Sequence, residues 1–326
     1  MSVSATVVSA PATTIKNLPI NLFASVMGLS GLALAWRSAG SAFGAPAGIA
    51  NAMGALAVLV FIALAIGYLV KWQRFPDAVK QEFAHPISSN FFGTVTIGVL
   101  LLSSVVDVWS PSLRVLLWTV ASAATLVLAV IIVSRLLNGK VPLSNVVPAW
   151  LIPGVATLDI AVAGGTLHMP WAHELNLLGA GVGTMLAVVF LVMILSRLVQ
   201  GDPLPLPMTP SLMILIGPFA VGFLAYVNVT GRVDGFAAML FYFAVFLFVV
   251  LAGRVFRPSV PFSPGWWAIS FPLAALANAA LAYAMVSDSL ALAGLAIALL
   301  AFLTVAIAVL TVRTLHWLWT GRLLSE

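Results

Sequence analysis

The chain has 326 residues, of which 62% are hydrophobic and only 7% are charged. An ordinary soluble domain carries about 25% charged residues, so the composition excludes a soluble protein and indicates an integral membrane protein. There is no cysteine, which excludes disulfides, iron–sulfur clusters and thiolate catalysis. The net charge of +5 comes with no long basic run, so we expect no nucleic-acid partner.

Ten apolar segments are long enough to be membrane-spanning helices, since a spanning helix needs about 20 apolar residues. The runs are continuously apolar rather than alternating, which favours helices over a barrel. We expect a disordered tail over 1–16, a ten-helix domain over 17–316 and a short tail over 317–326. The segments are approximately 18–36, 49–70, 87–109, 112–134, 146–166, 174–198, 209–229, 233–253, 264–286 and 289–312.

The basic residues are distributed unevenly between the two sides that these segments define. Only Arg37, Arg114 and Arg232 lie on one side. The side with both termini carries Lys16, Lys71, Arg74, Lys80, Arg135, Lys140, Arg197, Arg254, Arg257, Arg313 and Arg322. Loops rich in Lys and Arg stay in the cytoplasm, so we predict a multi-pass protein of the plasma (inner) membrane with both termini cytoplasmic.

A repeat of about 60 residues runs through the chain. An arginine follows each even-numbered segment, at intervals of 57 to 62 residues. Pro153 lies 18 residues after Arg135, and Pro272 lies 18 residues after Arg254. We interpret the period as five parallel helical hairpins, although any protein with ten helices and cytoplasmic arginines has a rough periodicity.

Prolines separate the odd from the even segments. They lie in or near the starts of odd segments, and the interiors of even segments have none. A membrane tolerates such helix breaks where protein or a water-filled cavity covers them. We therefore expect five inner odd helices, in a quasi-five-fold arrangement around a central pore, and an outer ring of even helices. The prolines are Pro19, Pro86, Pro148, Pro153, Pro218 and Pro272.

Residues for enzyme or cofactor chemistry are missing from the spans. The sequence has no phosphate-binding loop, and all of its lysines and histidines lie in loops or at span ends. The group of His168, His173 and Glu174 has no recognised metal-ligand spacing. We expect no enzyme, no metal site and no cofactor.

Asp159 is the one acidic residue predicted deep inside a span. An intramembrane carboxylate is by default a candidate functional group. The alternative is that the helix breaks at Pro153–Gly154, so that Asp159 caps its second half or reaches the outer mouth. Both readings remain open from the sequence.

The ninth segment contains a bulky ring beside a proline. Pro272 restricts Phe271 and releases the carbonyl of Ala268 from its hydrogen bond, which bends the helix. Phe271 at such a bend is either a packing residue or a side chain that projects towards the central axis.

Four stretches resemble a known family. Trp267, Ser270, Phe271 and Pro272 match the ninth helix of the tellurite-resistance and C4-dicarboxylate transporter family, which includes the slow-type anion channels of plant guard cells. The other matches are the stretch from His85-Pro86 to Phe92, the first helix from Leu18-Pro19 to Trp36, and the start of the fifth at 148–153.

The resemblance implies a homotrimer in which each protomer conducts small anions through its own pore. It also implies that Phe271 is the pore gate and that Pro272 supports it. Candidate pore-lining residues on the inner segments are Phe23, Gly28, Phe92, Ile152 and Phe219.

We therefore predict a passive anion channel in the lipid bilayer, gated by an aromatic side chain. The alternative is a proton-coupled secondary transporter of C4-dicarboxylates or of oxyanions such as tellurite, with Asp159 as the protonated group. Basic residues at the inner mouth, such as Arg197 and Arg254, either concentrate anions there or only fix the topology.

Overall fold

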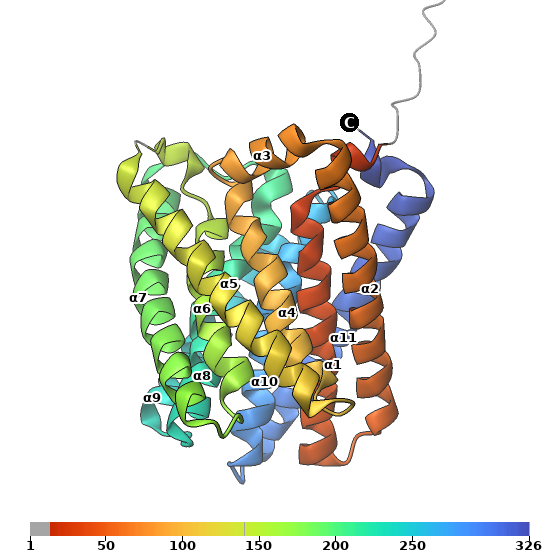
Figure 1. Ribbon diagram of the computed structural model, residues 1–326. Helices are drawn as coiled ribbons and strands as arrows, with labels where there is room; N and C mark the ends of the chain where they lie inside the picture. The colour runs from red at the N-terminus through yellow and green to blue at the C-terminus, as the bar shows by residue number, and fades with distance from the viewer. Residues whose placement is uncertain (1–13, 140, 326) are drawn as a thin grey trace, which may run out of the picture.

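The computed structural model describes residues 14–139 and 141–325, and all regular structure in these ranges is helical. Residues 1–13, which make up most of the predicted N-terminal tail, lie outside the described residues. Figure 1 shows long helices that run side by side between two ends of the molecule. The helices are α1 (Ala24–Phe43), α2 (Ala47–Arg74), α3 (Pro76–Ala84), α4 (Phe92–Val106), α5 (Pro111–Asn138), α6 (Leu151–Gly164), α7 (Pro170–Gln200), α8 (Gly217–Thr230), α9 (Gly235–Val255), α10 (Ser270–Met285) and α11 (Leu290–Trp319).

Within the described ranges, nine helical stretches are long and apolar enough to cross a membrane. They coincide with nine of the ten predicted segments. The predicted segment 146–166 forms a shorter apolar helix, Pro148–Gly164, because Val146 and Val147 are extended and the helix ends at Gly164. Hydropathy placed the end of the last segment at residue 312, whereas α11 continues past Arg313 and His316 to Trp319.

The five inner stretches share a local design. Each begins with a 3₁₀ segment and then becomes α-helical, and the prolines lie just before these segments, within them or in the first α-helical turn. A first-turn residue needs no intrahelical N–H bond, so proline is accommodated there. The expected helix bends are therefore changes of helix type near one end. The 3₁₀ segments are Ile20–Phe23, Ser88–Phe91, Pro148–Trp150, Leu206–Ile216 and Pro264–Ile269.

The outer helices are continuous and begin at recognisable N-terminal signals. Side chains of Ser110, Asp234 and Ser289 cap α5, α9 and α11 by accepting backbone N–H bonds. The Tyr226 hydroxyl also donates to Asp234, 2.6 Å away, and these hydrogen bonds hold the pKa of Asp234 below its ordinary value. The cap therefore favours the ionised carboxylate at the start of α9, where the helix dipole also favours a negative charge.

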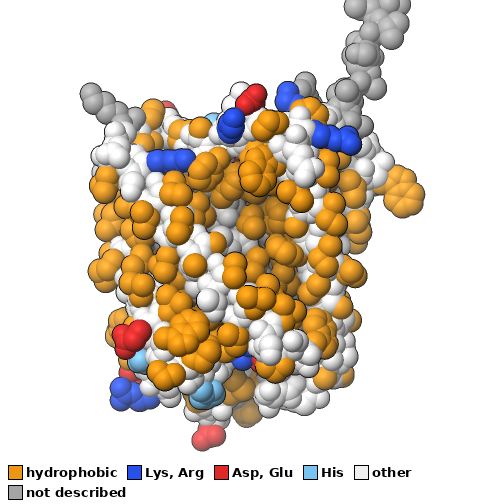
Figure 2. Space-filling view, in the orientation of Figure 1, with side chains coloured by type: hydrophobic (Ala, Val, Ile, Leu, Met, Phe, Trp, Pro, Cys, Tyr) orange, Lys and Arg blue, Asp and Glu red, His pale blue; other side chains and the backbone are white. Residues whose placement is uncertain are grey.

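Contacts between elements separate two sets of helices. Each outer helix packs against the inner helix before it, as in the pairs α1–α2 and α6–α7. The inner helices also contact one another in the order α1, α4, α6, α8 and α10, and α10 contacts α1. In each of the four long inner stretches, 61 to 78% of an apolar run of 18 residues is buried. In the outer helices the buried share of such a run is only 11 to 33%. The outer helices therefore carry the apolar surface that Figure 2 shows between two charged ends.

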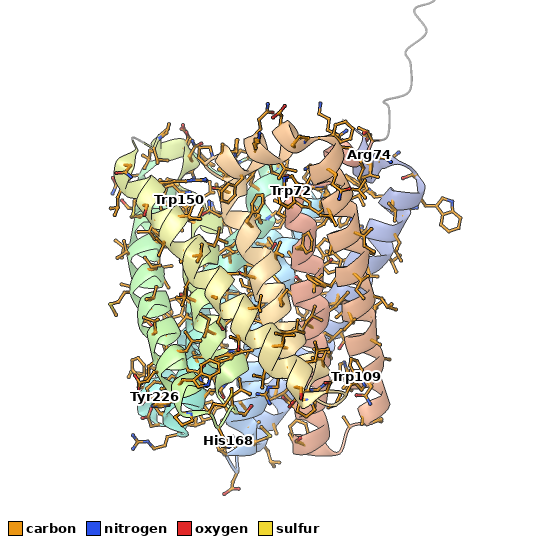
Figure 3. The ribbon with its side chains drawn as sticks, viewed as in Figure 1. Trp72, Arg74, Trp109, Trp150, His168 and Tyr226 are labelled. Carbon is orange, nitrogen blue, oxygen red and sulfur yellow. The ribbon has the colours of Figure 1, made fainter. Side chains whose placement is uncertain are left out.

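The described ends of the chain meet at one end of the molecule. The backbone N–H of Thr14 and the side-chain amide of Asn17 both donate to the carbonyl of Leu324. Figure 3 places Trp72 and Trp150 near this end and Trp109 near the opposite end. Tryptophans at two levels are typical of the two interfaces of a membrane.

The short helix α3 lies in a stretch that we predicted as a loop. Glu82 of α3 accepts hydrogen bonds from Lys71 and Tyr68 of α2 and from the backbone N–H of Ile20, and Lys71 also donates to the carbonyl of Leu18. The Lys71–Glu82 ion pair is 2.6 Å long, and its side chains are 5% and 15% exposed. It ties α2 and α3 to the start of the first inner stretch.

Candidate functional site

The stretch Trp267 to Pro272 is positioned by contacts with two neighbouring helices. The indole N–H of Trp267 donates to Thr314 Oγ1 on α11, 2.9 Å away. The Ser270 hydroxyl lies 3.1 Å from the Ala24 carbonyl on α1 and 2.7 Å from the Trp267 carbonyl. With Trp267 and Ser270 held in this way just before it, Phe271 is directed into the space among the inner helices.

Pro272 is the third residue of α10, two residues after the change from 3₁₀ to α-helix. Its ring takes the place of an N–H that the first turn does not need, so the proline stabilises the start of α10 rather than kinking its middle. The change of helix type sets the direction in which Phe271 leaves the backbone.

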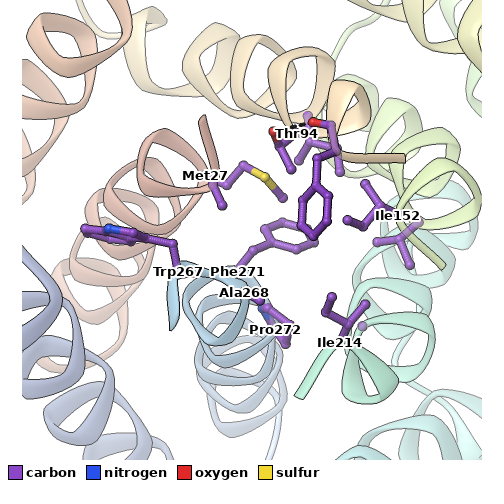
Figure 4. A pocket seen from close by; sticks show the side chains of 13 residues that line it. Met27, Thr94, Ile152, Ile214, Trp267, Ala268, Phe271 and Pro272 are labelled. Atoms are coloured by element: carbon purple, nitrogen blue, oxygen red, sulfur yellow. Dashed lines mark hydrogen bonds between the residues drawn. The ribbon is translucent and has the colours of Figure 1, made fainter. Parts of the chain in front are cut away.

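Phe271 projects into a cavity at the centre of the inner helices. The cavity has a volume of about 30 Å³, and every inner stretch contributes to its wall. Figure 4 shows the Phe271 ring between Met27, Thr94, Ile152 and Ile214, which come from four different inner stretches. The full lining is Ala24, Met27, Phe91, Thr94, Ile97, Ile152, Val155, Ile214, Gly217, Trp267, Ala268, Phe271 and Pro272.

The cavity is narrow and almost entirely apolar. Thr94 is one of its few polar side chains, and its hydroxyl donates to the carbonyl of Phe91 on its own helix. Phe271 itself is only 8% exposed. A hydrated anion would have to lose its water here without gaining a hydrogen bond, and apolar constrictions of this kind close a pore by excluding water.

The structure places the predicted pore-lining residues in different environments. Ile152 lines the cavity with Phe271 and Pro272. Phe23 and Phe92 line a separate, more open pocket among α1, α2, α4 and α5. Phe219 makes an edge-to-face contact with Phe243 of α9, with ring centroids 4.5 Å apart, in a pocket on the outer side of α8.

Gly28 lies at the contact between α1 and α10. A Cβ atom at this position would be 2.6 Å from Ser270 Cβ and 2.9 Å from Ile307 Cδ1. Its small size therefore lets α1 approach the helix that carries Phe271.

Replacing Gly28 with alanine should destabilise the protein by about 1–3 kcal/mol, because the added methyl overpacks this contact. Gly181 on α7 has no atom within 4 Å of its ideal Cβ, so Gly181→Ala serves as the control and should be neutral or stabilising. Denaturant unfolding in detergent measures both changes. Equal stability of the two variants would contradict a tight α1–α10 contact.

Asp159 is buried in the middle of α6, with 1% exposure. The helix runs without a break from Leu151 to Gly164, so the reading in which it breaks at Pro153–Gly154 and Asp159 caps the second half is wrong. The reason is that Pro153 lies in the first turn, where a proline does not interrupt the helix. Asp159 Oδ2 has no hydrogen-bond partner among the described residues.

Some basic residues at the end with the chain termini are bound to protein partners, and others face a pocket. Glu82 pairs with Lys71, and Arg135 donates to the carbonyl of Phe83. Arg254 and Arg257 line a pocket of about 250 Å³ at this end.

In the described ranges no group of three or more His, Asp or Glu side chains is placed to hold a metal ion.

Comparison with known proteins identifies the family. Residues 17–315 match the family described as SLAC1, voltage-dependent anion channel. This chain belongs to that family. The match covers all the spanning helices except the last residues of α11.

Relatives of this chain include both channels and transporters. An uncharacterized transporter of Methanocaldococcus jannaschii is 27% identical over 82% of this chain and 84% of its own length. The S-type anion channel SLAH3 of Arabidopsis thaliana is 28% identical over 91% of this chain, which corresponds to 48% of the plant protein. The tellurite resistance protein TehA homolog of Haemophilus influenzae is 27% identical over 82% of this chain and 81% of its own length. The chain is therefore a multi-span membrane protein of an anion channel and transporter family.

Proposed function

We propose that the protein is a passive channel for small anions, with ten spans in a quasi-five-fold arrangement and a pore along the axis of the five inner helices. The observation that carries the proposal is the apolar cavity around Phe271, to which all five inner stretches contribute. The closed ring of contacts among the inner helices supports a pore within one chain. Phe271 is the gate, and Pro272 with the 3₁₀ segment before it sets the position of the ring.

The charge distribution supports anions as the permeant ions. Arg254 and Arg257 at the end with the chain termini attract anions to that mouth. The cavity wall carries no charged side chain, so an anion that enters is bound weakly and leaves readily, as conduction requires. We also propose a homotrimer in the plasma membrane with cytoplasmic termini, in line with the excess of Lys and Arg on that side.

A proton-coupled carrier of C4-dicarboxylates or oxyanions is the second candidate function. The buried Asp159 favours it, because intramembrane carboxylates often carry protons in transporters. The two functions differ in what drives the flux.

Anion flux into proteoliposomes at equal pH on both sides tests the proposed function. We expect Phe271→Ala protein to pass chloride or nitrate down its own gradient, and a protonophore should not stop it beyond its effect on the membrane potential. Flux that needs an imposed proton gradient and disappears when the protonophore collapses it would establish the carrier instead.

A further inference from the structure

The side of α6 that faces α7 is defined by close contacts. A Cβ atom at Gly183 of α7 would touch Gly154, Thr157 and Leu158 of α6. A Cβ atom at Gly179 would touch Thr157 and Ile160. An α-helix advances about 100° per residue, so Asp159 lies roughly opposite the centre of this face. It shares a stripe with Ile152 and Val155, at spacings of three and four residues, and both of those residues line the Phe271 cavity.

Asp159 therefore faces the axis of the inner helices, one helical turn beyond the cavity. It lies four positions after Val155, which corresponds to about 6 Å along the helix. The inner helices start at the end of the molecule with the chain termini, so Asp159 lies on the opposite side of Phe271 from that end.

The repeat places a second polar residue at the matching position. Pro153 and Pro272 are the third residues of α6 and α10, and Asp159 and Asn278 are the ninth. Asn278 lies seven residues after Phe271, close to the Phe271 side of α10 and within reach of α1. Its amide donates to the carbonyls of Gly31 and Ala274, at 3.0 and 2.8 Å. Two inner helices thus bring polar groups to one level of the axis.

Within the part of the chain that the structure describes, no ion pair compensates Asp159. The helices packed against α6 are α4, α5, α7 and α8. None of their titratable side chains, among the described residues, forms a hydrogen bond or an ion pair with the Asp159 carboxyl group. Arg114 of α5 reaches the end of α6, where it donates hydrogen bonds to the carbonyl of Ala163 and to Thr166, and it also pairs with Asp107. Helix α4 has no titratable side chain. The titratable side chains on the other three helices are Arg114 and Arg135 on α5, His173, Glu174 and Arg197 on α7, and Tyr226 on α8, whose hydroxyl donates to Asp234.

We propose that Asp159 is a proton-binding, permeation-controlling residue of the pore, which conducts when Asp159 is protonated and is blocked to anions when it is ionised. An unpaired buried carboxylate is costly unless it holds a proton, and a carboxylic acid can donate a hydrogen bond to a passing anion. An ionised carboxylate on the axis repels the same anion at short range. This inference rests on the proposed channel function.

The test uses the Phe271→Ala channel in proteoliposomes, with chloride flux measured at equal pH on both sides, from about pH 8 to about pH 5. We expect the flux to rise at least about tenfold on acidification, because protonation removes the repulsion. Adding Asp159→Asn should keep the flux at its acid level throughout the series. Glu174→Gln, which changes an exposed acid on α7, is the matched control and should leave the rise unchanged.

The repeat offers a second variant that moves the acid to the other helix. Asp159→Asn combined with Asn278→Asp should restore the rise on acidification. The inference is overturned if the channel with Asp159→Asn still gains flux on acidification, or if it is folded and conducts at no pH. Absence of flux in folded Phe271→Ala protein at every pH, with either residue at position 159, would overturn the channel function itself.

Discussion

Replacing Phe271 with alanine should open a path through the centre of the protein and raise the anion current at least about tenfold, the change that a barrier lower by about 1.4 kcal/mol produces. The ring lies in a cavity of about 30 Å³ where all five inner stretches meet. Its removal leaves room for water and hence for a partly hydrated anion. Current recordings in planar bilayers, at matched protein amounts, measure the effect.

Phe219→Ala is the control for this prediction. It makes the same substitution on a neighbouring inner helix, at a ring that contacts Phe243 of α9 edge to face and does not line the cavity. We expect no gain of current in this variant. A Phe271→Ala protein that is folded but conducts no better than the original chain would remove Phe271 as the gate.

Replacing Lys71 with methionine should lower the free energy of unfolding by about 3–5 kcal/mol, since it leaves Glu82 buried without its cationic partner. The Lys71–Glu82 pair is 5% and 15% exposed and holds α2, α3 and the first inner stretch together. Unfolding by denaturant in detergent gives the change. The exposed Lys80–Asp77 pair, at 76% and 85%, provides the control, and Lys80→Met should cost less than about 1 kcal/mol.

A double variant separates the ion pair from simple loss of packing. Lys71→Met with Glu82→Gln removes both charges but keeps a side-chain oxygen that can accept from the Ile20 N–H. It should recover much of the stability lost in Lys71→Met, because no uncompensated buried charge remains. If the double variant is as unstable as Lys71→Met, packing rather than charge holds this corner together.

The spans could be predicted because hydropathy depends only on composition along the chain. The proline pattern also identified the inner helices, since proline is restricted to positions where a backbone N–H is not needed. α3 could not be found this way because it is short and only partly apolar. The end of α11 was placed too early because Arg313, Thr314 and His316 interrupt the apolar run, whereas the helix continues past them to Trp319.

The face of each inner helix was harder to predict than its position. An inner helix such as α6 is apolar all round, so no polar stripe marks the side that faces the axis. Of the predicted pore-lining residues, Ile152 lies on the wall of the Phe271 cavity, whereas Gly28 and Phe219 face neighbouring helices. The cavity residues Met27 and Val155 had no distinguishing feature in the sequence. Helical spacing from Phe271 and Ile152, once these were known, is the signal that finds the others.

The route of the anion is the central claim, and a thiol placed on the cavity wall tests it most directly, because the chain has no cysteine of its own. Val155→Cys in the Phe271→Ala channel is treated with a negatively charged, membrane-impermeant methanethiosulfonate while chloride flux is followed. Val130→Cys on the exposed side of α5, where Val130 is 66% exposed, is the matched control. We predict progressive loss of flux with Val155→Cys and none with Val130→Cys. Full chloride flux while the thiol at position 155 stays unmodified would contradict a path through the centre of the inner helices.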